Sequence, residues 1–65
     1  MANSKVIKYL NGLIKDEKEA IAGYAKAIYA LAHDTQSNVI FALVEIKQQE
    51  INHKNELESI KKRFE

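Results

Sequence analysis

The chain has 65 residues, no cysteine and a formal net charge of +1. Domains of this length usually need a disulfide, a metal ion or a partner subunit for stability, and the lack of cysteine excludes the first. Acidic and basic residues are interleaved, which argues against nucleic-acid or membrane-surface binding. No apolar run reaches the roughly 18 residues of a membrane span and no signal peptide is evident, so we expect a cytoplasmic protein.

The first predicted element is a long amphipathic helix at about residues 5–31, with Asn3 and Ser4 as candidate N-cap residues. Its inner face follows alternating steps of four and three residues, the spacing of a heptad repeat. This inner row consists of Val6, Leu10, Leu13, Glu17, Ala20, Tyr24, Ala27 and Leu31. A second row, formed by Ile7, Ile14, Ile21 and Ile28, widens the apolar face beyond what one neighbouring helix covers.

A polar segment follows, and Asp34, Thr35 or Ser37 within it could cap a second helix at about residues 38–63. The second helix repeats the alternation with Val39, Leu43, Ile46, Glu50, His53, Leu57, Ile60 and Phe64. Because the connection is so short, the two helices must run antiparallel. We therefore predict one all-α domain over residues 1–65, an antiparallel helical hairpin that dimerises into a four-helix bundle. Tyr29 and Phe41, at outer positions near the turn, could join dimers into a higher oligomer.

Three residues with acidic or imidazole side chains interrupt the inner rows, namely Glu17, Glu50 and His53. Counted from the turn, all three fall at the same height, and Glu50 and His53 share one helical face. In a two-fold dimer they would gather four carboxylates and two imidazoles, whose mutual repulsion two divalent cations would offset. Mixed oxygen and imidazole ligands suit iron or manganese, with zinc as a substitute. Taken singly, each of these residues could instead fix the register of the helices.

The motifs around these residues resemble those of the ferritin-like superfamily, in particular bacterioferritin and rubrerythrin. The matching positions are Glu17, Ala20 and Tyr24 for Glu-x-x-Ala-x-x-x-Tyr, and Glu50, His53 and Leu57 for Glu-x-x-His with a following Leu. The resemblance implies a ferritin-like four-helix bundle of which one chain supplies half, as in the small encapsulated ferritin-like proteins. It implies two iron ions per dimer, with Glu17 and His53 as terminal ligands and Glu50 as a bridge.

The function that the resemblance implies is a di-iron oxidoreductase of ferroxidase or peroxide-reducing type, acting on dioxygen or peroxide. Glu50 and Tyr24 are then the candidate catalytic residues, although Tyr24 could equally be an ordinary core aromatic. No haem is expected, since Ile51 stands where bacterioferritin has its haem-ligating methionine. One alternative is a structural or interaction dimer with a non-catalytic metal or polar core layer. Another is a designed protein or a fragment of a larger ferritin-like protein.

Overall fold

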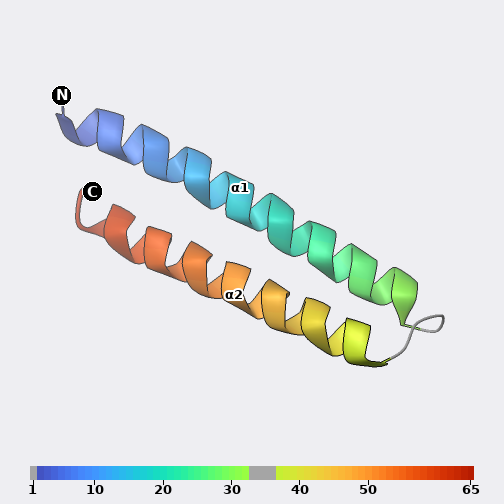
Figure 1. Ribbon diagram of the computed structural model, residues 1–65. Coiled ribbons are helices and arrows are strands. Elements are labelled where there is room, and N and C mark those ends of the chain that lie inside the picture. Colours follow the sequence, from blue (N-terminus) through green and yellow to red (C-terminus); the bar gives the residue numbers. More distant parts are fainter. Residues whose placement is uncertain (1, 33–36) are drawn as a thin grey trace.

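The computed structural model describes residues 2–32 and 37–65, which form two long antiparallel helices packed side by side (Figure 1). Helix α1 spans Ala2–Leu31 and helix α2 spans Ser37–Lys62. The start of α1 and the end of α2 lie at the same end of a rod 51 Å long (Figure 1). The prediction of an all-α antiparallel hairpin is confirmed. Neither helix contains a stretch long and apolar enough to cross a membrane.

The helix ends differ slightly from the predicted ones. Helix α1 begins three residues early, so Asn3 and Ser4 lie in its first turn and the prediction that they cap it is wrong. Both residues tolerate that place, because the first backbone N–H groups of a helix have no partner within it. Asp34 and Thr35, proposed as caps of α2, lie outside the described residues, as does the Ser37 side chain.

At its other end, α2 stops one residue before the predicted boundary. The Arg63 amide donates to the Ile60 carbonyl at 3.0 Å, and the Phe64 amide donates to the Lys61 carbonyl at 2.9 Å. These bonds span three residues instead of four, so the chain tightens as the helix ends. At the start of α2, the Val39 amide donates to the Asn38 side chain at 2.9 Å.

The core of the hairpin is very small. Among the described residues, only the apolar side chains of Leu10 and Ile14 are buried. Leu13, which the heptad spacing had placed in the inner row, is 51% exposed, so that prediction is wrong for the packing within one chain. Helix α2 contacts the side of α1 that carries Ile14, and Leu13 faces the neighbouring flank. A residue from the second predicted row therefore takes the place of one from the first.

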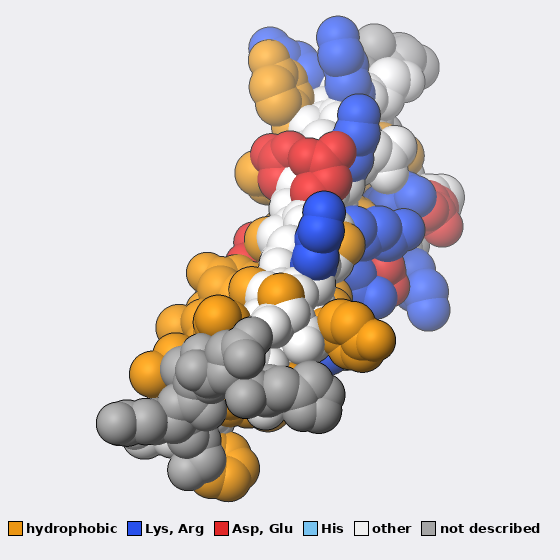
Figure 2. All heavy atoms as spheres, turned by 90° about the vertical axis from the view of Figure 1, so that its right-hand side faces the viewer, with side chains coloured by type: hydrophobic (Ala, Val, Ile, Leu, Met, Phe, Trp, Pro, Cys, Tyr) orange, Lys and Arg blue, Asp and Glu red, His pale blue; other side chains and the backbone are white. Residues whose placement is uncertain are grey.

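The flank that carries Leu13 is uncovered. It also holds Val39, which is 40% exposed, and Ile60, which is 37% exposed. Val39 and Ile60 share one face of α2, because they lie three heptads apart. We call this side of the hairpin the open flank. Seen from the turn, hydrophobic side chains gather at the turn end while charged side chains lie farther along the rod (Figure 2). Tyr29 and Phe41 near the turn are also exposed.

Replacing Ile14 by Ala should lower the free energy of unfolding by about 2–4 kcal/mol, since it removes buried methyl groups from a core with little else to compensate. Urea unfolding followed by circular dichroism measures this. The exposed neighbour Lys15 serves as control, and its Ala variant should stay within about 0.5 kcal/mol of the parent. Equal effects at both positions would show that Ile14 is not part of the core.

Candidate metal centre

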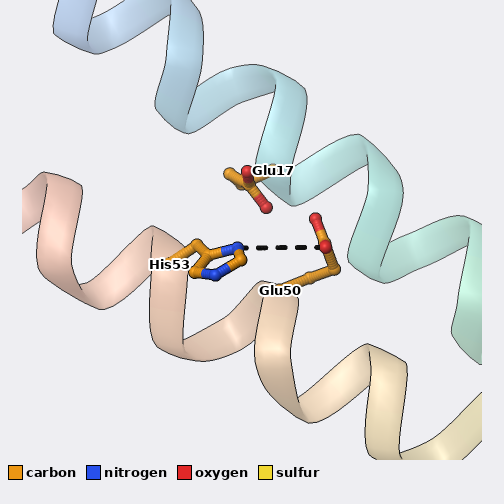
Figure 3. A group of neighbouring side chains, drawn as sticks. All are labelled: Glu17, Glu50 and His53. Atoms are coloured by element: carbon orange, nitrogen blue, oxygen red, sulfur yellow. Dashed lines mark ion pairs between the residues drawn. The ribbon is translucent and has the colours of Figure 1, made fainter.

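The three polar residues of the predicted inner rows converge midway along the rod. Glu17 comes from α1, while Glu50 and His53 come from α2, and Figure 3 shows their side chains pointing toward one another between the helices. One ligand-type atom from each residue lies within 4.8 Å of the other two. The predicted juxtaposition is confirmed, whereas metal binding by these residues stays a prediction. No other His, Asp or Glu of the described chain joins this group.

Glu50 and His53 lie one turn apart on the same face of α2 (Figure 3). Glu50 Oε1 is 3.9 Å from His53 Nδ1, which is too long for a hydrogen bond but close enough for an ion pair when His53 is protonated. The Glu50 side chain is 24% exposed and that of His53 is 57% exposed. The imidazole therefore lies at the edge of the seam between the helices, on the side of the hairpin that α1 and α2 leave exposed.

Glu17 is the strained member of the group. Its Oε2 atom is buried and has no hydrogen-bond partner within the described chain. The pKa of Glu17 is raised, first because its protonated form can hydrogen-bond to Glu50, then because of burial and repulsion by the Glu50 charge. A charge on His53 acts in the opposite direction. When both carboxyl groups are ionised neither can donate a proton, which leaves Oε2 unsatisfied.

The arrangement fits a divalent cation. A buried, unpartnered carboxylate oxygen facing a second carboxylate attracts positive charge, and an imidazole beside them adds a nitrogen donor of the type that iron, manganese and zinc accept. Three donors are fewer than the four that a closed zinc site takes. The ligand set of one chain therefore leaves coordination positions for further ligands.

Tyr24, predicted as a possible catalytic residue, lies two turns from Glu17 toward the hairpin turn. With Ala20, Gly23, Ala27 and Leu43 it lines a shallow apolar depression. Within the described residues, its hydroxyl makes no hydrogen bond to the Glu17, Glu50 and His53 group. The structure thus places Tyr24 beside the candidate site without joining it to a ligand.

An open groove near the chain ends was not predicted from the sequence. Four lysines line it, together with Asn11, Ile14, Glu58 and Glu65; the lysines are Lys15, Lys18, Lys61 and Lys62. Lys61 is 3.4 Å from Glu65, so part of its charge is offset by an exposed ion pair of small energetic value. The sequence signal for part of this groove is the terminal basic run of Lys61, Lys62 and Arg63.

No family model, curated protein or solved structure matches the chain. The ferritin-like resemblance therefore depends on the two ligand motifs alone, and the class of the site is argued from its geometry.

The raised pKa of Glu17 predicts a pH dependence of the metal-free protein. Below the ordinary pKa of Glu, Glu17 is protonated in both the folded and the unfolded state. As pH rises above it, the unfolded state ionises Glu17 freely, whereas ionisation in the folded state is opposed by Glu50 and by burial, so the folded state loses stability. Glu17→Gln should therefore unfold at higher urea concentration than the parent near neutral pH, and this advantage should shrink around pH 4.

Glu19, exposed on the same helix, is the matched control. The midpoint of Glu19→Gln should differ from the parent by less than that of Glu17→Gln near neutral pH. A Glu17→Gln midpoint that is equal to or below the parent's near neutral pH would contradict the assignment of strain to Glu17.

Proposed function

We propose that two copies of this chain form a ferritin-like four-helix bundle that holds two divalent metal ions, iron in the first instance. The protein would act as an oxidoreductase of ferroxidase or peroxide-reducing type. The observation that carries this proposal is the convergence of Glu17, Glu50 and His53 around a buried carboxylate oxygen without a partner. A second chain would double the donor set to four carboxylates and two imidazoles.

In this proposal Glu17 and His53 of each chain are terminal ligands, and Glu50 is shared between the two ions, as the motif resemblance implies. The i, i+3 spacing of Glu50 and His53 supports it, because both side chains project from the same face of α2 toward Glu17 (Figure 3). The elevated pKa of Glu17 supports it as well, since a cation relieves the repulsion that raises this pKa.

Two iron ions held by these residues would supply the two electrons that dioxygen or peroxide takes up. The neighbouring side chains would hold the three ligand residues in place and control the access of water and oxidant to the metal. Ile14, one turn from Glu17 on α1, is buried where the helices meet. The small residues Ala20, Gly23 and Ala27 border the depression beside the site and leave room for a small oxidant. Tyr24 lines the same depression, where its hydroxyl could donate a proton or hydrogen bond to that oxidant.

A structural metal site in a helical-hairpin dimer is the second candidate. The favouring observation is the core, which contains only two buried apolar side chains among the described residues. A protein with so little burial gains stability from any cation that binds only the folded state. Zinc, which has no redox chemistry, would serve this role as well as iron. The two candidates share the ligands and differ in turnover.

Metal binding should require all three ligands. The parent should bind one cobalt or ferrous ion per chain under anaerobic conditions, and Glu50→Ala or His53→Ala should lower the affinity by more than about 100-fold, because loss of a ligand exceeds the effect of losing its supporting contacts. Equilibrium titration with optical detection of cobalt measures this. Glu45→Ala, at an exposed position on α2, is the control and should bind as the parent does. Unchanged affinity in both ligand variants would contradict the metal assignment.

Catalysis is tested separately from binding. Stopped-flow mixing of the ferrous protein with dioxygen or peroxide should oxidise iron faster than free ferrous iron, and Glu50→Ala should abolish the acceleration. The zinc-loaded protein should remain folded without turnover. If iron binds at one ion per chain yet oxidises no faster than free iron, the structural candidate replaces the oxidoreductase.

A further inference from the structure

The open groove near the chain ends has positively charged side chains on both of its walls. Its volume is about 400 Å³, and four lysines line it, two from each helix. Lys15 and Lys18 lie one turn apart on α1, and Lys61 and Lys62 lie in the last turn of α2. Side chains lean toward the start of their own helix, so in an antiparallel pair these two sets of ammonium groups reach toward each other along the rod.

The two acidic side chains that line the groove offset only part of this charge. Glu65 Oε1 is 3.4 Å from Lys61 Nζ, and Glu58 Oε1 is 3.7 Å from Lys54 Nζ, so each acid already has a cation beside it. Within the described residues, the other three lysines of the groove make no ion pair; they are Lys15, Lys18 and Lys62. Three ammonium groups thus line the groove without a negatively charged partner in the described chain.

The stability of the helices accounts for only half of this cluster. Cations in the last turn of α2 interact favourably with the helix dipole, which is a sufficient reason for Lys61 and Lys62. Lys15 and Lys18 lie midway along α1, where the dipole has little effect. Cations gathered around one groove repel one another, and a multivalent anion between them would offset that repulsion.

The groove lies away from the open flank. Lys15 is two residues from Leu13, which places the two side chains on nearly opposite sides of α1. A second chain bound to the open flank would therefore leave the groove accessible. The buried side chain of Ile14 also lines the groove, and apolar surface beside the lysines strengthens their attraction for an anion because it excludes water.

We propose that this groove binds a linear chain of linked phosphate groups, such as inorganic tripolyphosphate. Lysine binds phosphate as a point charge without a fixed geometry, which suits four flexible side chains in an open groove. A chain fits better than a single phosphate, because the cations line two walls and the groove has more than ten times the roughly 30 Å³ of one water molecule in the liquid. None of the lining residues is aromatic, so a nucleotide base would have no stacking partner.

Calorimetric titration of the metal-free protein with tripolyphosphate tests the proposal independently of the metal centre. Lys18→Ala and Lys62→Ala, at exposed positions, should each weaken binding by about three- to tenfold, because each removes one charged contact. Lys26→Ala is the control, because Lys26 is exposed outside the groove, about 12 Å from Lys18 along α1. Near physiological ionic strength charges so far apart are largely screened, so this variant should bind within about twofold of the parent.

Absence of binding by the parent would overturn the proposal. Equal losses in all three variants would overturn it as well, since net charge alone would then attract the anion.

Removing an acid from the groove should have the opposite effect. Glu65→Gln releases Lys61 from its ion pair and should tighten tripolyphosphate binding by about twofold or more. Glu45→Gln makes the same change of charge at an exposed position of α2 outside the groove, and should bind as the parent does. Tighter binding by both variants to the same extent would contradict a site in the groove.

A comparison of ligands tests the chemistry of the anion. Inorganic phosphate should bind more weakly than tripolyphosphate, and ATP should bind no more tightly, because its base finds no aromatic side chain in the groove. Three results would each overturn the choice of a phosphate chain recognised by its charge. They are equal affinity for inorganic phosphate, tighter binding of ATP, and tighter binding of a glutamate peptide of the same charge.

Discussion

Two carboxyl groups face each other across the seam between α1 and α2, and both the stability of the hairpin and its proposed metal binding depend on this contact. Glu50 of α2 lies close enough to Glu17 of α1 to raise the pKa of Glu17, and one Glu17 oxygen is buried without a partner within the described chain. Such a pair destabilises an empty hairpin near neutral pH, because neither carboxylate can donate a hydrogen bond. The imidazole of His53, at the edge of the group, adds a nitrogen donor to the two carboxylates. A cation between these three side chains would offset the repulsion between the two carboxylates and use all three as donors.

Because the core is so small, the hairpin needs another source of stability to fold despite the repulsion between Glu17 and Glu50. A 65-residue hairpin with two buried apolar side chains among its described residues lacks the burial that stabilises a typical domain. Its apolar residues are present, but many lie on faces that α1 and α2 do not cover. In the proposed dimer, part of this uncovered apolar surface would be buried when the second chain brings its own set of ligands. Folding, association and metal binding would then stabilise one another, since each favours the same state.

Much of this architecture could be predicted because helices have a fixed rise. With no proline and one short break, two helices of similar length must lie antiparallel, and counting residues from the turn placed Glu17 level with Glu50 and His53. Periodicity could not decide which part of a wide apolar stripe faces the other helix of the same chain. Leu13 and Ile14 are adjacent, and both belong to apolar rows; α2 covers Ile14 and leaves Leu13 exposed.

Other details were also beyond the sequence. Asn3 and Ser4 are common cap residues, yet both lie inside α1, which begins at Ala2. The motif placed Tyr24 near the ligands, but a hydrogen bond depends on the side-chain direction, and none joins Tyr24 to them in the described structure. The unpartnered Glu17 oxygen likewise became visible only with the side chains in place.

In the proposed dimer, the ligand set of each chain is completed by the other chain. The most direct test measures the dimer dissociation constant by sedimentation equilibrium across a series of cobalt or anaerobic ferrous concentrations, for the parent and for His53→Ala. Metal should tighten the parent dimer in proportion to site occupancy and leave the association of His53→Ala unchanged. A parent chain that binds metal as a monomer, with the same association constant at every metal concentration, would contradict it.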